Sequence, residues 1–213
     1  MGNQEQTMID KAKPIIFSTP MVIEILAGRK TQTRRPMKPQ PDLTGMRFTG
    51  ERWEMYLGYP LGHDVPLGRI NSGDILYVKE TFFKNNLPDG YGFNAATEYF
   101  YKANNYPSEV YEQMKCFGYK WKSSRFMPKK AARIFLEVTD VKIGPLQDIT
   151  DKQIFEEGCR FAKTVKWDDL IPDLRAMARK DLFVPLWDSI YKKSGHTWAT
   201  NPFVWAYEFE RMK

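Results

Sequence analysis

The sequence is poor in the residue types that most often form cross-links or bind metals. Cysteine occurs only at Cys116 and Cys159, and histidine only at His63 and His196. Two cysteines cannot build the disulfide framework of a small secreted domain, and none of these four residues has metal-ligand spacing to another. We therefore expect no disulfide scaffold and no metal centre, and we interpret each histidine as a surface or capping residue.

Long apolar runs and targeting signals are also lacking. No segment is apolar over the length needed to span a bilayer, and the N-terminus has no apolar core of a secretory signal. Met1-Gly2 would suit myristoylation, but the sixth position is Gln6 rather than Ser or Thr. The chain has no glycine-rich phosphate loop with its lysine, so we expect no cofactor. We expect a cytoplasmic protein without a membrane partner.

What the sequence does contain is enough apolar material for a core. The chain has 213 residues, of which 42% are hydrophobic and 15% aromatic, so we expect one domain with insertions. Its 32 Lys and Arg exceed its 26 Asp and Glu, giving a net charge of +6, which favours a polyanionic partner. We expect a flexible tail over residues 1–12 and a single domain over residues 13–213.

The patterning predicts an α+β protein. Alternating apolar residues and capping signals mark its strands and helices. One such signal is a capping box of Thr150 and Gln153, in a helix that Gly158 should end. We expect strands at Pro14–Phe17, Asp74–Val78, Ala132–Val141 and Phe203–Phe209, and helices at Pro20–Ala27, Thr150–Glu157, Trp167–Lys180 and Leu182–Lys192. Residues 36–72 and 84–124 are two loop-rich insertions, with a hairpin around Arg52–Leu57 and a strand at Glu98–Lys102.

A basic turn near the start of the chain is the most informative local feature. The run Gly28–Arg35 contains four cations and two threonines directly after a glycine that suits the end of a helix. Such a turn offers an anion charged donors and hydroxyl groups. A solvated basic turn without a ligand is the alternative.

Three later segments accompany this turn in a characteristic order. They are Gly73–Glu80, Ala131–Val138 and Thr150–Gly158. With the G-x-K-x-x-x-R turn of Gly28, Lys30 and Arg34, the chain from Lys13 to Met212 resembles the ASCH domain. In its size and its Asn201–Trp205 ending it is most similar to ASCH proteins of bacteriophages and prophages. This family is a branch of the PUA-like superfamily, so the resemblance implies a partly open β-barrel decorated by helices, associated with RNA and modified bases.

The resemblance also implies a candidate catalytic set. In ASCH amidohydrolases that deacetylate N4-acetylcytidine, the matching lysine, threonine and glutamate fall on Lys30, Thr33 and Glu157. A lysine whose pKa is lowered by neighbouring cations could take the proton of Thr33, and Glu157 could position water or bind the cytosine amine. Lys30 and Thr33 are three residues apart, so their convergence requires a turn or bulge. Alternatively, Lys30 and Glu157 form an ordinary ion pair and Thr33 caps a turn.

Further residues are candidates for ligand binding. The cations that flank the catalytic set, and the residues that follow the Asp74 strand, could contact a phosphate or a base; they are Arg29, Arg34, Arg35, Glu80, Phe82, Lys129 and Arg133. Glu80 could read a base edge and Phe82 could stack on the base. Equally, Glu80 could only neutralise Arg34 or Arg133.

The stretch Lys115–Arg133 is a second candidate interface. It contains seven cations and no acid, interleaved with Phe117, Tyr119, Trp121 and Phe126. Cations can track phosphates while rings stack on unpaired bases, which is typical of single-stranded nucleic acid binding. The alternative is a basic loop whose aromatic residues pack inward.

These observations together predict a protein that binds RNA, single-stranded nucleic acid or a modified nucleoside. The predicted cleft is lined by the Lys30 turn, Glu80 and Glu157. The rival hypothesis is an amidohydrolase of N4-acetylcytidine-like substrates that uses Lys30, Thr33 and Glu157. Ribonuclease activity without a metal is associated with some relatives, but the two separate histidines of this chain do not support it.

Overall fold

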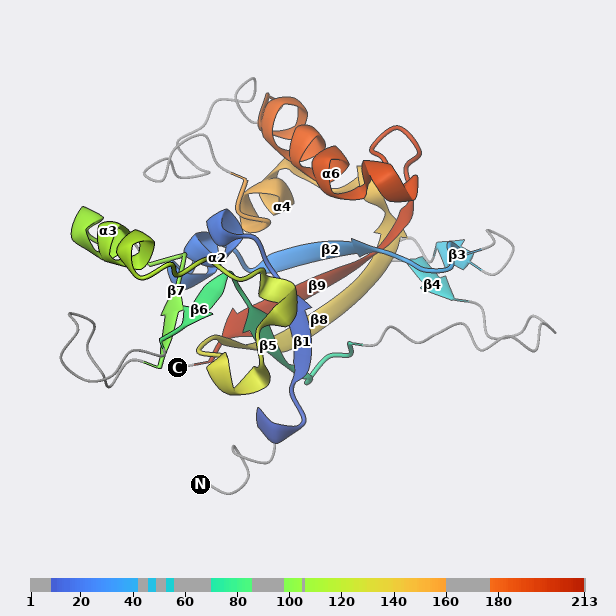
Figure 1. Cartoon of the computed structure of the whole chain (residues 1–213). Helices are drawn as coiled ribbons and strands as arrows, with labels where there is room; N and C mark the ends of the chain where they lie inside the picture. The colour runs from blue at the N-terminus through green and yellow to red at the C-terminus, as the bar shows by residue number, and fades with distance from the viewer. Residues whose placement is uncertain are drawn as a thin grey trace. The chain divides into compact units, whose positions relative to one another are not determined.

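The structure is a computed structural model that describes residues 9–41, 46–48, 53–55, 70–85, 98–104, 106–159 and 177–212 (Figure 1). Its strands are β1 Lys13–Ile16, β2 Gln32–Pro36, β3 Met46–Phe48, β4 Trp53–Met55, β5 Ile75–Lys79, β6 Phe82–Lys84, β7 Tyr99–Tyr101, β8 Phe135–Pro145 and β9 Phe203–Arg211. Its α-helices are α2 Thr19–Leu26, α3 Ser108–Cys116, α4 Asp151–Glu156 and α6 Val184–Tyr191. Shorter turns are the π-helical η5 Ala178–Phe183 and the 3₁₀ turns η2 Ser124–Phe126, η3 Lys129–Ala131, η4 Leu146–Asp148 and η6 Lys192–Ser194. The predicted α+β class is confirmed.

The main sheet is mixed and has five strands in the order β1-β5-β8-β9-β2. Strand β1 runs parallel to β5, whereas β5 is antiparallel to β8 and β2 is antiparallel to β9. Within the described residues the sheet is open, because β1 and β2 are its two edges. Strands β3 and β4 form a separate pair, as do β6 and β7. The PUA-like barrel stays a prediction.

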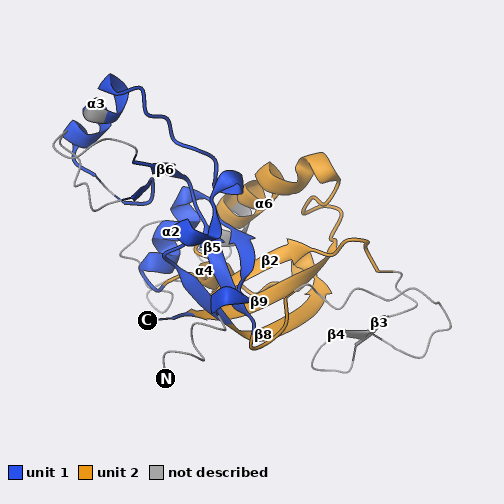
Figure 2. Ribbon diagram, turned by 60° about the horizontal axis from the view of Figure 1, so that its bottom comes forward, with its two compact units in different colours: residues 1–28, 74–137, 211–213 blue, residues 29–73, 138–210 orange. Residues whose placement is uncertain are grey.

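The chain divides into two compact units (Figure 2). The first contains residues 1–28, 74–137 and 211–213, and the second contains residues 29–73 and 138–210. Strand β8 begins in the first unit and continues in the second. The single domain over residues 13–213 stays a prediction.

The first unit is built around β5 and an aromatic hairpin. Ile75, Leu76 and Val78 are buried in β5, as their apolar pattern predicts. In the β6–β7 hairpin, the rings of Phe83 and Phe100 stack with their centroids 4.7 Å apart. A stacked ring pair contributes stability beyond the burial of the two side chains, so aromatic packing stabilises this hairpin.

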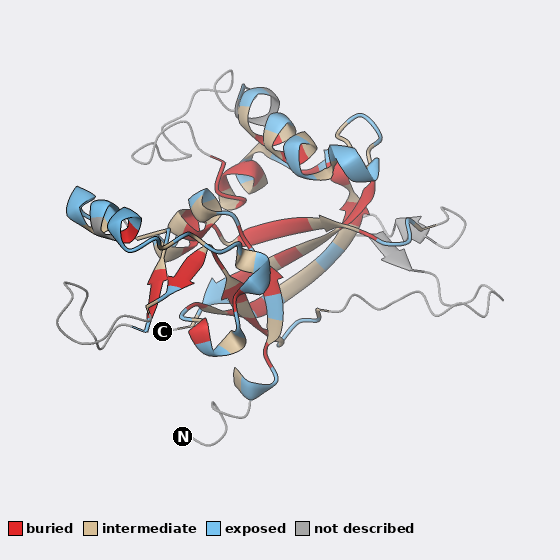
Figure 3. Cartoon of the chain, in the orientation of Figure 1, coloured by how far each residue is buried: buried red, intermediate tan, exposed pale blue. Residues whose placement is uncertain are grey.

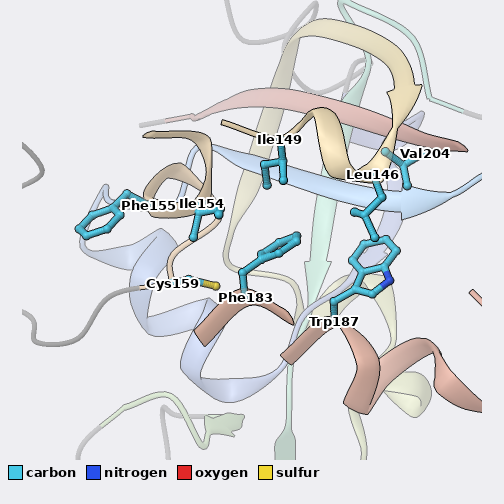
Figure 4. Packing of buried hydrophobic residues seen from close by; sticks show 8 residues of the cluster. All are labelled: Leu146, Ile149, Ile154, Phe155, Cys159, Phe183, Trp187 and Val204. Atoms are coloured by element: carbon cyan, nitrogen blue, oxygen red, sulfur yellow. The ribbon is translucent and has the colours of Figure 1, made fainter. Parts of the chain in front are cut away.

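The second unit has its own apolar core, which joins the helices to the main sheet (Figure 4). The ring of Phe183 points toward Ile149 and Ile154, and Trp187 of α6 lies beside Leu146. The core consists of Leu146, Ile149, Ile154, Phe155, Cys159, Phe183, Trp187 and Val204. It encloses one side of α4, which carries the candidate glutamate at its end.

Several predicted elements are confirmed with shifted ends. The long strand β8 begins later than expected and extends to Pro145, and its buried Leu136 and Val138 alternate with exposed residues (Figure 3). The strand within the second insertion is β7. The proposed helix at Trp167–Lys180 lies largely outside the described residues, as do residues 1–8 of the proposed tail. Residues 9–12 include a turn in which the Ala12 amide donates to the Ile9 carbonyl, and Ala12 is buried; the flexible tail over residues 1–12 stays a prediction.

Candidate functional site

The Lys30 turn is fixed to two other elements of its unit. Gly28, whose φ of +69° favours glycine, ends the helical turn that follows α2. The amide of Thr31 then donates to the carbonyl of Glu156 at 2.9 Å, and the carbonyl of Thr31 accepts from Phe209 at 2.8 Å. The turn is therefore held between the end of α4 and strand β9.

Glu157 occupies a defined position at the end of α4. Thr150 and Gln153 form the predicted capping box at the start of this helix. At its end, Gly158 has a φ of +86° and donates to Phe155, while Cys159 donates to Ile154. These two hydrogen bonds together form the Schellman motif, which ends a helix at a defined residue. It sets Glu157 where its side chain meets the Lys30 turn.

Glu157 is shared by two cations. The Lys30 ammonium lies 2.9 Å from one carboxylate oxygen, and the Arg34 guanidinium lies 3.1 Å from the other. Lys30 also donates to the carbonyls of Gln32 and Glu157, each at 2.7 Å. The side chains of Lys30 and Glu157 are 2% and 8% exposed, so water contributes little to their solvation. The cations Lys30 and Arg34 therefore both contact the Glu157 carboxylate at a site largely shielded from solvent.

Two glutamines complete this network. Gln32 and Arg34 share one face of β2, and the Arg34 guanidinium lies 3.4 Å from the Gln32 amide oxygen. Arg34 also donates to the Gln153 amide oxygen at 3.0 Å, which in turn accepts from the Thr150 main chain. The capping box of α4 therefore also positions Arg34.

Burial and the neighbouring charges shift the pKa values of both Lys30 and Glu157. Burial lowers the pKa of Lys30 below its ordinary value of 10.5, although Glu157 acts in the opposite direction. Burial alone would raise the pKa of Glu157, but the charges and hydrogen bonds of Lys30 and Arg34 outweigh burial and hold it below 4.5. Glu157 is therefore ionised at neutral pH, and Lys30 loses its proton more readily than a solvated lysine.

Thr33 contacts Arg35 rather than the Lys30–Glu157 pair. It follows the turn as the second residue of β2, and its hydroxyl accepts a hydrogen bond from Arg35 at 2.8 Å. Adjacent strand residues leave opposite faces, so Thr33 leaves the face opposite to Arg34, which contacts Glu157. The structure thus joins Lys30 with Glu157, whereas Thr33 is joined to Arg35. The catalytic role of these three residues stays a prediction.

Glu80 belongs to the other unit and has a partner there. Its carboxylate accepts from the Arg133 guanidinium at 2.8 and 3.0 Å, a two-pronged ion pair. The same guanidinium donates to the Asn104 amide oxygen at 2.7 Å and lies 4.0 Å from the ring centroid of Tyr101. This geometry agrees with the alternative in which Glu80 neutralises Arg133. Sequence reasoning missed Asn104 and Tyr101, which no motif marks.

The remaining candidate residues lie in less specific surroundings. Phe82 is 3% exposed and packs with Tyr99, Met127 and Ala131, so it is a core residue here rather than an open stacking surface. Lys129 donates to the main-chain carbonyl of Asp10 and lies 5.6 Å from the Tyr77 ring centroid. Arg29 is half-buried at the start of the basic turn.

The described residues contain no group of three or more histidine, cysteine or acidic side chains placed to bind a metal ion. In the same part of the chain, no helix has both the length and the apolar character to cross a membrane.

Comparison with known proteins gives no relative for this chain. No family model matches it, and neither a curated protein nor a solved structure matches it. The ASCH resemblance therefore remains a prediction based on the motifs of the sequence.

Proposed function

We propose that this protein is an ASCH-type binding protein that recognises RNA or a modified nucleobase through Lys30, Arg34 and Glu157. One observation carries the proposal: the buried Glu157 carboxylate lies 2.9 Å from Lys30 and 3.1 Å from Arg34. The resemblance of the sequence motif adds support, since Gly28, Lys30 and Arg34 follow the pattern that the family shares.

The network has the chemistry that reading a base edge requires. Two cations contact the single Glu157 carboxylate, and clustered cationic donors of this kind favour the carbonyl oxygens of a base or the phosphate of a nucleotide. Each carboxylate oxygen has two lone pairs, so Glu157 can accept from an exocyclic amine while it keeps its cation. The side chains are already ordered by the Schellman motif, the capping box and the bonds of the turn, so binding costs little ordering entropy.

Amidohydrolysis of N4-acetylcytidine is the second candidate, and two observations favour it. Burial lowers the pKa of Lys30, which suits a general base, and Arg35 donates to the Thr33 hydroxyl, which would stabilise an alkoxide. The reaction would consume water and release cytidine and acetate. In the present arrangement Lys30 donates three hydrogen bonds, so it serves as a base only after losing a proton.

Equilibrium titration with free cytidine and N4-acetylcytidine tests the proposal, with product analysis of the same samples. The informative variant is Glu157→Gln, measured at a temperature where circular dichroism shows it folded. The matched control is Glu156→Gln, the same chemical change one residue earlier. Losing a hydrogen bond to a charged group weakens binding by roughly tenfold to a hundredfold, so we expect that loss in Glu157→Gln alone.

The possible outcomes separate the two candidates. Binding without product supports the binding function, whereas release of cytidine that Thr33→Ala abolishes supports the hydrolase. Equal affinity of the Glu157 and Glu156 variants, or no binding of either nucleoside by the wild type, contradicts the proposal.

A further inference from the structure

We propose that an exposed strip in the first unit, formed by Lys120, Lys122, Arg125 and Phe126, binds single-stranded nucleic acid. This strip belongs to a different unit from the Lys30 network, and the inference does not depend on the function proposed for that network. It rests on how the strip is anchored, on its charge and on one exposed aromatic ring.

The segment before η2, residues 119–122, is extended, and its aromatic side packs against the β6–β7 hairpin. The Tyr119 ring stacks on Phe83 at 5.2 Å, and Trp121 meets the same ring edge-on at 5.3 Å. The main chains of Lys122 and Phe82 of β6 exchange two hydrogen bonds: the Phe82 amide donates to the Lys122 carbonyl at 3.2 Å, and the Lys122 amide donates to the Phe82 carbonyl at 2.7 Å. Because alternate residues of an extended segment point to opposite sides, the inward rings leave Lys120 and Lys122 exposed.

The turn η2 then presents Arg125 and Phe126. The Ser123 side chain caps this turn by accepting from the Arg125 amide, and Lys79 donates to the Arg125 carbonyl at 2.6 Å. The next residue, Met127, is 2% exposed and packs in the cluster of Phe82. Phe126 is nevertheless 72% exposed. An aromatic ring held outward by a fixed turn suits stacking on a base, because little order is lost when the base arrives.

The charge of this segment is unbalanced. Between Lys115 and Arg133 the chain has seven cations and no acid. Arg133 is bound to Glu80, and Lys130 lies 3.6 Å from Glu98. Among the described residues, no ion pair involves Lys120, Lys122 or Arg125. Within that part of the chain, these three cations are exposed and can contact phosphates.

Single-stranded nucleic acid fits this combination better than other polyanions. Its phosphates follow the cations while its unpaired bases can stack on Phe126. A duplex hides its base faces, so it could use the charges but not the ring. A membrane surface needs a larger apolar area than one ring for stable binding.

Fluorescence anisotropy with labelled oligouridine and oligodeoxythymidine of roughly ten nucleotides tests the inference. We expect Phe126→Ala to weaken binding at least about fivefold, because one stacked base is lost. The double variant Lys120→Ala/Lys122→Ala should reduce the slope of log affinity against log salt by about 1.4, for two phosphate contacts on a single strand.

Comparable surface substitutions are available as controls in the second unit: an exposed apolar side chain and an exposed lysine pair. Ile190 is 58% exposed, and Lys192 and Lys193 are exposed in η6. Ile190→Ala and Lys192→Ala/Lys193→Ala should bind like the wild type. Since all the substituted side chains lie on the surface, melting temperatures should be unchanged.

Four results would overturn the inference: equal losses in strip and control variants, an affinity insensitive to salt, a duplex bound as tightly as a single strand, or binding to anionic phosphatidylserine vesicles without oligonucleotide binding. Either RNA or DNA as the bound single strand supports it. Free nucleosides carry no phosphate, so their titration tests the Lys30 network separately, and each proposal can fail alone.

Discussion

Replacing Glu157 by glutamine is the most informative perturbation of stability. The change removes the one negative charge between Lys30 and Arg34 while keeping the size of the side chain. The glutamine oxygen can still accept from one cation, but its amide group then faces the other. Two charge-assisted bonds are therefore lost or weakened in a buried place. Removing one partner from a buried ion pair costs about 3–5 kcal/mol.

The matched control is again Glu156→Gln. Glu156 is 29% exposed and lies 4.0 Å from the exposed Lys152, so this ion pair contributes at most about 1 kcal/mol. Its bond from the Gln32 amide, at 2.9 Å, can persist with a glutamine oxygen. Both variants remove one negative charge from the end of α4, so their difference isolates the contribution of the buried pair.

Thermal and denaturant unfolding measure this difference. For a chain of this size a loss of about 3–5 kcal/mol lowers the melting temperature by roughly 6–20 °C. Lys30→Met should also destabilise the chain, because it removes a charge from Glu157 and the donor to the carbonyls of Gln32 and Glu157. Melting temperatures of Glu157→Gln and Glu156→Gln that agree within error would contradict the prediction.

Three further predictions follow from the same contacts. The pKa of Glu157 is lower in the folded chain than its ordinary 4.5, so the unfolded chain binds the proton more tightly and the free energy of unfolding falls as pH drops from 4.5 through the folded pKa. Denaturant unfolding between about pH 3 and pH 7 should therefore show a smaller loss of stability in Glu157→Gln than in the wild type. Glu80→Gln should cost about 1.5–3 kcal/mol, less than Glu157→Gln, since Arg133 is 27% exposed and water can replace its partner; equal unfolding losses would contradict this. Gly158→Ala should lower stability by about 1–2 kcal/mol in thermal melts because φ is +86° there, and an unchanged melting temperature would show that the Schellman motif is not required.

Local sequence signals predicted the Lys30 turn and the helix that carries Glu157, but not the contact between them. The capping box of Thr150 and Gln153, and the stop at Gly158, follow from residue types a few positions apart, and both are present in the structure. Lys30 and Glu157 are separated by 127 positions, and no local preference determines such a contact. The family resemblance paired them, whereas period-two alternation in β2 would have placed Gln32 and Arg34 on one face.

The stretch Lys115–Arg133 shows a different limit of sequence-based prediction. Its composition predicted either a single-stranded nucleic acid interface or a basic loop with inward-packed aromatic residues. In the structure Tyr119 and Trp121 contact Phe83, whereas Phe126 is exposed, and the interface stays a prediction. The helix α3 was not predicted, because most of its nine residues are polar, although Val110 and Met114, four positions apart, pack on one apolar cluster. Which aromatic side chain turns inward depends on packing against β6 and β7, and that packing is not local in sequence.

Amide NMR shifts during a titration of the wild type with cytidine or N4-acetylcytidine would show whether the Lys30 network binds a nucleobase. This measurement needs no variant that could unfold. We expect saturable shifts concentrated in residues 29–35 and 153–158, on either side of the Lys30–Glu157 pair. Saturable shifts confined to other parts of the chain, or no shifts with either nucleoside, would contradict it.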